Sequence, residues 1–123
     1  MTKTQYRFLK LGSILMAVSV ALGAIGAHIL KKSLSPIALE TFHTGVRYHT
    51  IHSLSLITLS LFPKTFNIKW TGILFIMGVI LFSFGCYSYA LTGIKTFVHI
   101  VPIGGISFIL GWFCLFFSNR LRD

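Results

Sequence analysis

Acidic residues are nearly absent from this sequence. Its only carboxylate side chains are Glu40 and Asp123, the last residue, against eleven lysine and arginine residues, and the formal net charge is +9. No pair of carboxylates is therefore placed to act as general acid and base. The chain also has no Gly-rich phosphate loop, no HExxH pair and no nucleophile elbow. These absences predict a protein that is not an enzyme.

Cysteine and charged residues of any kind are also scarce. Cys86 and Cys114 each lie inside an apolar run without CxxC spacing, which favours buried thiols over a disulfide or a metal site. Charged residues make up only 11% of the chain, hydrophobic residues 54%, and the mean hydropathy is +0.83. Soluble proteins carry about a quarter charged residues. The composition is that of a membrane protein.

The basic residues are scattered between apolar runs and form no single face. This pattern does not favour nucleic acid as a partner. It is typical of contacts with anionic lipid headgroups, so membrane lipids are the expected partners. The length of 123 residues predicts one integral membrane domain over residues 1–123.

Four apolar runs are long enough to be considered as membrane spans, since a hydrocarbon core about 30 Å thick needs roughly 20 apolar residues of helix. They cover residues 11–29, 46–62, 70–91 and 97–117. The second is the shortest and carries Arg47. The connections at 63–69 and 92–96 allow only turns, so the helices they join should be antiparallel. The predicted fold is an all-α membrane protein with four transmembrane helices in an antiparallel bundle.

The link between the first two spans should contain a short interfacial helical segment. Ser35 followed by Pro36 is the cap and first-turn pair of a helix start. From there Glu40, His43 and Arg47 fall on one stripe. We expect this segment to bend near Gly45 into the second span, with Glu40 close enough to pair with Arg47. The alternative is a solvated polar face.

Lysine and arginine are distributed unequally between the two ends of the predicted bundle. One side holds seven (Lys3, Arg7, Lys10, Lys64, Lys69, Arg120 and Arg122) and the other four (Lys31, Lys32, Arg47 and Lys95). By the positive-inside rule, both termini should be cytoplasmic in a multi-pass protein of the cell membrane. Trp70 and Trp112 then fall towards the cytoplasmic interface. A cleaved signal peptide is the competing interpretation of the first span, and the three further spans argue against it.

Small residues recur at helical spacing within the predicted spans. Helices in a bilayer gain no hydrophobic advantage by pairing, so small residues that allow close approach supply much of the attraction. The spacing predicts packing positions at Gly23, Gly26, Gly78, Gly85, Gly104 and Gly111.

Four sequence blocks resemble those of a known family. They are "LGAIGAH" (22–28), "TGVRYHTIH" (44–52), "LFSFGCYSYAL" (81–91) and "PIGGISFILGW" (102–112). In this order and spacing they are similar to the signature blocks of domain-of-unknown-function family 423, also called uncharacterised protein family 0382, a family of small bacterial membrane proteins. The matching motif positions are Gly23, Gly26, Ala27, His28, Gly45, Tyr48, His52, Pro102, Gly104, Gly105, Gly111 and Trp112. The resemblance implies a multi-pass plasma-membrane protein with four helices and implies no reaction.

Ionisable residues in or near membrane spans are candidate functional residues. The sequence predicts a polar cluster in the outer half of the bilayer, formed by His28, Arg47, Tyr48, His52 and His99. The resemblance does not support His43, which lies outside the blocks, or His49. Imidazole could bind a metal or relay a proton, and arginine could hold an anionic headgroup. The competing interpretation is a set of hydrogen-bonded polar residues that holds the helices in register.

The sequence alone therefore favours a non-enzymatic membrane protein that acts through helix or lipid contacts. The alternative function is a conduit or binding protein for a small solute, a metal or a proton, which could assemble as a homo-oligomer. Two facing histidines could hold a haem, but nothing else in the sequence supports one, and no cofactor is predicted.

Overall fold

The computed structural model describes residues 1–118, and within them the chain forms only helices and connecting turns. Arg120, Arg122 and Asp123 lie outside the described residues. The elements are α1 (Lys3–His28), the short 3₁₀ turn η1 (Leu30–Lys32), α2 (Pro36–Leu59), α3 (Lys69–Gly78), the π-helical turn η2 (Val79–Ser83), α4 (Phe84–Thr92) and α5 (Thr96–Phe117).

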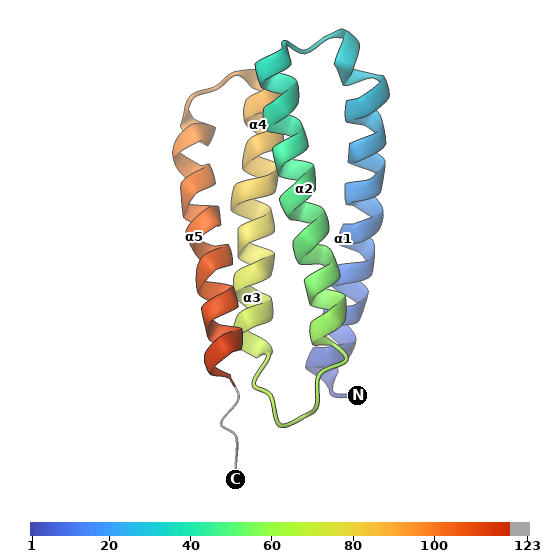
Figure 1. Ribbon diagram of the computed structural model, residues 1–123, viewed down its shortest axis with the longest axis vertical. Coiled ribbons are helices and arrows are strands. Elements are labelled where there is room, and N and C mark those ends of the chain that lie inside the picture. Colours follow the sequence, from blue (N-terminus) through green and yellow to red (C-terminus); the bar gives the residue numbers. More distant parts are fainter. Residues whose placement is uncertain (119–123) are drawn as a thin grey trace.

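The elements α3, η2 and α4 follow one another directly and form a third rod, so the fold has four rods. Figure 1 shows them side by side, with the chain reversing direction at each connection. The start of α1, the α2–α3 connection and the end of α5 lie together at the lower end of the view. The α1–α2 and α4–α5 connections lie at the upper end. These two ends are called the terminal end and the opposite end below.

Three helical segments of the described chain are long and apolar enough to cross a membrane. They are Lys3–Lys32, Lys69–Thr92 and Thr96–Phe117. The second rod, α2, does not meet the same criterion of length and hydropathy, although its 24 residues extend for about 36 Å. Its sequence interrupts apolar residues with imidazole and hydroxyl side chains, which lowers its hydropathy without shortening it.

Two helix starts have side-chain caps. Thr2 and Gln5 form a capping box at α1, in which each side chain accepts a hydrogen bond from the other residue's backbone N–H. The hydroxyl of Ser35 accepts from the backbone N–H of Ala38 at 3.2 Å, and Pro36 occupies the first turn of α2. The helix start predicted at Ser35 and Pro36 is therefore confirmed. α4 ends at Thr92 and is followed by Gly93, whose φ of 68° is the left-handed conformation that glycine adopts at helix ends.

The predicted interfacial segment is not a separate element, and this expectation was wrong. α2 continues through Gly45 without interruption from Pro36 to Leu59. Glycine is needed there for close packing: a Cβ at position 45 would lie 2.8 Å from Cε1 of Tyr87 and 3.0 Å from the carbonyl oxygen of Ser83. The separate short helix between α1 and α2 is the 3₁₀ turn η1.

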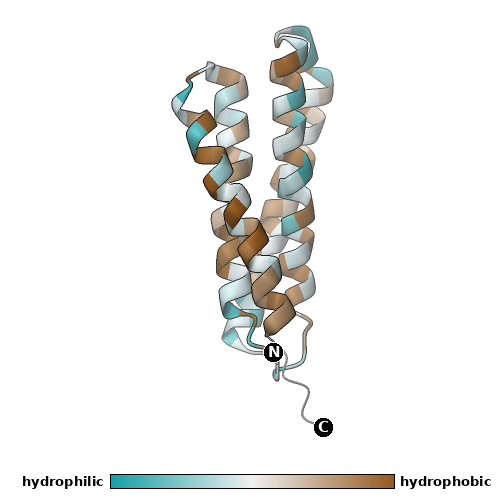
Figure 2. Ribbon diagram, turned by 60° about the vertical axis from the view of Figure 1, so that its left-hand side comes forward, coloured by the Kyte–Doolittle hydropathy of each residue, from teal (hydrophilic) through white to brown (hydrophobic). Residues whose placement is uncertain are grey.

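The rods pack in the order α1, α2, third rod, α5. α1 packs chiefly on α2, α3 packs chiefly on α5, and α4 packs chiefly on α2. The outer rods keep large apolar side chains exposed, for example Ile14 and Val20 on α1 and Ile106 and Phe113 on α5. Figure 2 shows hydrophobic residues over most of the length of α5, with hydrophilic positions near its start. Such faces fit a lipid environment better than water.

The buried core consists of two clusters. The larger one contains Phe8, Leu56, Leu59, Ile68, Phe75, Val79 and Phe108. The smaller one, towards the opposite end, contains Phe42, Tyr87 and Ala90. Buried histidine, serine and threonine side chains accompany both clusters, and these polar groups define the candidate site.

Candidate functional site

His52, in the second half of α2, is 98% buried and makes hydrogen bonds at both ring nitrogens. Its Nδ1 lies 2.8 Å from the carbonyl oxygen of Tyr48, one turn earlier in α2. Its Nε2 accepts a hydrogen bond from the indole Nε1 of Trp112 in α5, at 3.1 Å. His52 therefore joins α2 to α5.

These two partners define the protonation of the ring. A carbonyl oxygen can only accept, so Nδ1 of His52 must carry a proton. The indole N–H can only donate, so Nε2 must be unprotonated. The imidazole is thus the neutral Nδ1–H form, and neither nitrogen is left to bind a ligand.

Aromatic rings enclose this imidazole. The ring of Phe108 in α5 stacks on His52 with centroids 3.6 Å apart, and the ring of Phe75 in α3 meets it edge-on at 5.0 Å. Trp112 packs against Phe75 at 4.8 Å. The side chains of Tyr48, His52, Phe75, Phe82, Phe108 and Trp112 are called the aromatic cluster below.

Two glycines make room for the aromatic cluster. A Cβ at Gly78 would overlap the ring of Phe108. A Cβ at Gly111 would lie 2.7 Å from the ring of Phe75, which is closer than van der Waals contact. The glycine spacing noted in the sequence therefore coincides with the positions where the rings beside His52 need space.

His49, one turn before His52, lies in a second polar site and is fully buried. Its Nδ1 lies 2.9 Å from the hydroxyl of Tyr87 in α4. Its Nε2 has no hydrogen-bond partner among the described residues. The backbone of Leu15 in α1 lies near the ring of His49, without a hydrogen bond to Nε2. His49 thus lies where α1, α2 and α4 meet.

Hydroxyl groups complete the polar interior of α2. Thr50 donates to the carbonyl of Val46 at 2.8 Å and lies 3.1 Å from the hydroxyl of Ser19 in α1. Ser53 donates to the carbonyl of His49 at 2.7 Å. Most of these groups are therefore paired within the bundle, which is how polar side chains are accommodated between membrane helices.

The predicted cluster of His28, Arg47, Tyr48, His52 and His99 is only partly assembled. Tyr48 and His52 are adjacent, and their rings lie 6.4 Å apart, nearly parallel. His28 ends α1 and His99 lies in the first turn of α5, both exposed at the opposite end. Pro36, the first residue of α2, lies at that same end. Because a helix rises about 1.5 Å per residue, His52 lies roughly 24 Å further along the axis and so far from His28 and His99.

Arg47 does not join His52, because Arg47 is exposed on the surface of α2 and His52 is buried. Nη2 of Arg47 lies 4.0 Å from Oε1 of Glu40, and the two side chains are 63% and 71% exposed. The predicted proximity of this pair is present, on the surface of α2. The pair contributes little to stability, since exposed ion pairs typically contribute 0 to about 1 kcal/mol.

Within the described residues, no group of three or more His, Cys, Asp or Glu side chains could hold a metal ion. Cys86 is buried and Cys114 is half-buried, and both are free thiols.

The other predicted packing glycines also face neighbouring helices, at different closeness. A Cβ at Gly104 would overlap the backbone of Leu81 and Phe82, and one at Gly85 would lie 2.9 Å from Val101. At Gly26 it would lie 3.0 Å from Phe42, whereas at Gly23 the nearest atom is 3.4 Å away, in ordinary contact. Three further glycines with close contacts, Gly12, Gly45 and Gly72, were not among the predicted packing positions.

The sequence interpretation did not place His49 and Trp112 in the site. His49 was set aside on the family resemblance, and Trp112 was assigned to the membrane interface. One signal was available for Trp112, because it and His52 both fall in the resemblance blocks. For His49 the available signal was its spacing, since His49, His52 and Ser53 share one helical stripe.

Four long helices, apolar outer faces and an internal layer of paired polar groups define a small helical membrane protein. The comparisons with known proteins agree. The profile of the family described as "Protein of unknown function (DUF423)" matches residues 22–105. The chain belongs to this family.

Its relatives are membrane proteins by name. A UPF0382 membrane protein of Staphylococcus haemolyticus is 39% identical over 114 residues, covering 91% of this chain and 93% of that relative. One from Staphylococcus aureus is 35% identical over 114 residues, with the same coverage of 91% and 93%. The UPF0382 inner membrane protein YgdD of Escherichia coli K12 is 33% identical over 98 residues, covering 77% of this chain and 75% of that relative. No solved structure gave a significant match to the chain.

Proposed function

We propose that this protein is a four-span protein of the cell membrane with both termini in the cytoplasm. In this proposal it acts through helix and lipid contacts and catalyses no reaction. α2 is the fourth span: its length of about 36 Å exceeds the hydrocarbon core of about 30 Å. Three of the polar side chains that lower its hydropathy, His49, His52 and Ser53, are buried against neighbouring rods and do not face lipid.

The distribution of charge supports the orientation. In the described chain the terminal end carries Lys3, Arg7, Lys64 and Lys69, with Lys10 two turns further along α1. The opposite end carries Lys31, Lys32 and Lys95, and the paired Glu40 and Arg47 lie in the half of α2 nearest to it. The more basic end is cytoplasmic by the positive-inside rule.

One observation supports a structural role for the polar centre most directly. Both ring nitrogens of His52 are occupied by groups of the protein itself, Tyr48 and Trp112, and the ring is enclosed by Phe75 and Phe108. A histidine that binds a metal or transfers a proton needs a nitrogen that can reach its ligand. In this proposal His52 holds α2 and α5 together.

Metal titration and thermal unfolding of purified protein test this role. Calorimetric titration with Zn²⁺ should detect no saturable site that depends on His28 and His52. The protein and its His28→Ala, His52→Ala double variant should therefore give the same result. His52→Ala should destabilise the fold by about 1 to 3 kcal/mol, because it leaves the Trp112 N–H without its partner. His28→Ala is the matched control and should leave stability unchanged, since His28 is exposed. Saturable binding that disappears in the double variant, or unchanged stability in His52→Ala, contradicts the proposal.

A conduit for protons is the second candidate, and His49 is the observation that favours it. Its Nε2 is buried and unpaired among the described residues, and its Nδ1 contacts the hydroxyl of Tyr87. Proteoliposomes with a pH-sensitive dye inside measure proton flux directly. Flux above that of protein-free vesicles, lost in His49→Gln and retained in His43→Gln, would favour the conduit over the structural role.

A further inference from the structure

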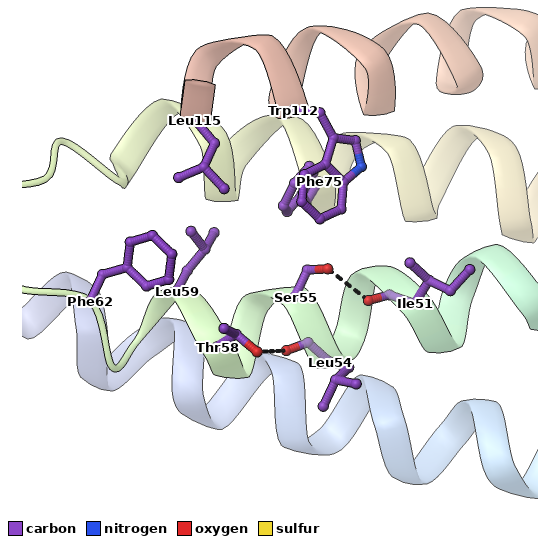
Figure 3. A pocket seen from close by; sticks show the side chains of 9 residues that line it. All are labelled: Ile51, Leu54, Ser55, Thr58, Leu59, Phe62, Phe75, Trp112 and Leu115. Atoms are coloured by element: carbon purple, nitrogen blue, oxygen red, sulfur yellow. Dashed lines mark hydrogen bonds between the residues drawn. The ribbon is translucent and has the colours of Figure 1, made fainter. Parts of the chain in front are cut away.

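An apolar groove opens between α2 and α5 at the terminal half of the molecule. It has a volume of about 300 Å³ and is lined by Ile51, Leu54, Ser55, Thr58, Leu59, Phe62, Phe75, Trp112 and Leu115. Figure 3 shows these side chains: the two helices form its walls and Phe75 of α3 projects between them. Its two hydroxyls are already paired, Ser55 with the carbonyl of Ile51 and Thr58 with that of Leu54. The groove therefore presents hydrocarbon and aromatic surface.

The length of the groove matches one leaflet of a bilayer. From Ile51 to Phe62, just beyond the end of α2, the groove runs along roughly 15 Å of the helix axis. This is half of a hydrocarbon core of about 30 Å. The groove starts near the middle of the molecule and ends at the terminal end, where the α2–α3 connection begins.

A second hollow lies on the other side of Trp112. It has a volume of about 330 Å³ and is lined by Ile109, Trp112, Phe113 and Phe116, which share one stripe of α5. Leu115, the other α5 residue of the groove, falls on the opposite side of the indole. Trp112 thus separates two apolar hollows at the same depth.

The charge at the terminal end of the molecule favours a ligand with an anionic headgroup. Lys64 follows Phe62 by two residues, and Lys69 begins α3, the helix that supplies Phe75 to the groove. Every charged side chain at this end of the described chain is basic, and the acidic Glu40 lies at the opposite end. Basic residues at a membrane surface attract anionic headgroups.

Resting on the proposed membrane function, we propose that these two hollows bind a phospholipid with an anionic headgroup. Its acyl chains lie on either side of Trp112, one of them in the groove between α2 and α5, and its phosphate lies near Lys64 and Lys69. The paired Trp112 and His52 form the inner end of the site, because their hydrogen bond holds the indole between the two hollows.

Quenching of tryptophan fluorescence by brominated lipids tests this proposal. The chain has two tryptophans, so the Trp70→Phe variant reports on Trp112 alone. This variant is reconstituted into vesicles of phosphatidylglycerol and phosphatidylcholine, with brominated acyl chains on one lipid or the other. Brominated phosphatidylglycerol should quench Trp112 at a mole fraction at least about fivefold lower than brominated phosphatidylcholine does, since each lysine near a headgroup contributes about 1 kcal/mol.

Two pairs of variants distinguish binding at this site from a general attraction of anionic lipids to the basic protein. Lys64→Gln with Lys69→Gln should bring the ratio of the two lipids close to one. Lys31→Gln with Lys32→Gln removes the same charge at the opposite end and should leave the ratio unchanged. Ser55→Phe should fill the groove and weaken quenching by both lipids, whereas Val20→Phe on the exposed side of α1 should not. The lysine variants alter only exposed side chains, so they remain informative if Ser55→Phe folds poorly.

Equal quenching by the two lipids in the Trp70→Phe variant would overturn the proposal. So would a selectivity that falls equally in both lysine pairs, or one that survives filling of the groove. A second copy of the chain in the groove would protect Trp112 from both lipids, and this protection would disappear when the protein is diluted. That result would also overturn the proposal. These outcomes leave the membrane span count and orientation untouched, since vesicle quenching depends on neither.

Discussion

The indole nitrogen of Trp112 and Nε2 of His52 lie 3.1 Å apart, although 60 positions separate the two residues in the sequence. This hydrogen bond connects the second rod to the fourth across the aromatic cluster. It is also the contact by which the polar interior meets the apolar groove, because Trp112 is half-exposed and His52 is buried.

Replacement of Trp112 by Phe should destabilise the protein by removing this hydrogen bond while retaining a ring. Hydrogen bonds between membrane helices contribute about 0.6 kcal/mol on average and up to about 1.7 kcal/mol. A double-mutant cycle of Trp112→Phe with His52→Phe, read by unfolding in detergent, should give a coupling in this range. Trp70→Phe is the control, since Trp70 is 60% exposed. Strictly additive losses in the cycle would contradict the bond.

Replacement of Gly104 by Ala should destabilise the packing of α5 on the third rod. The added methyl group would meet the backbone of Leu81 and Phe82, which cannot move aside as a flexible side chain can. The cost should be about 1 to 3 kcal/mol, the usual penalty for overpacking. Gly105→Ala is the matched control, because its Cβ would lie 3.6 Å from the Phe82 ring in ordinary contact. Equal unfolding midpoints for the two variants would show that α5 does not approach this closely.

The ion pair between Arg47 and Glu40 should contribute almost nothing. Both side chains are exposed and the separation is 4.0 Å, so a double-mutant cycle of Arg47→Ala with Glu40→Ala should give a coupling below about 0.5 kcal/mol. Adding salt should abolish what coupling there is. A coupling of several kcal/mol, or one insensitive to salt, would place the pair in a buried environment and refute its exposed position.

The orientation is testable with reporter fusions. A reporter that is active only in the cytoplasm should be active when fused after residue 118 and inactive when inserted in the α1–α2 connection at Ser33. Inversion of this pattern would contradict the positive-inside assignment. Activity at both positions would show that α2, the third rod and α5 do not all cross the membrane.

Several parts of the fold follow from the sequence for clear physical reasons. Helix ends depend on local chemistry, so Ser35 and Pro36 predicted the start of α2. Short connections require neighbouring rods, and glycines at intervals of seven predicted where rings and backbones come close, as at Gly78 and Gly104. In each case the cause lies within a few residues or in the small size of glycine itself.

Other features could not be predicted from the residues alone. Polar side chains lie on more than one face of α2, with Arg47 exposed and His49 and His52 buried, so hydropathy does not say which side of α2 turns inward. The burial of His49 and the partner of His52 depend on that rotation, which the neighbouring rods determine. We expected Gly45 to bend the helix. That prediction failed because the residues around Gly45 in the sequence do not reveal that Tyr87 packs against it.

The π-helical turn η2 has a consequence for how the third rod contacts its neighbours. Each residue of an α-helix turns the direction of the side chains by about 100°. The extra residue that a π turn inserts into one helical turn therefore changes the phase of every side chain after it. Twelve positions separate Phe75 from Tyr87, which in a regular α-helix would turn the two side chains about 120° apart. The residue taken up by the π turn brings them back to one side of the rod, where Phe75 meets His52 and Tyr87 contacts His49, both of α2. One continuous rod thus presents two aromatic side chains to the same helix. If residues 79–83 adopted a regular α-helix without loss of a residue, Tyr87 would turn about 100° away from His49, whereas deleting one residue together with the π turn would keep its direction.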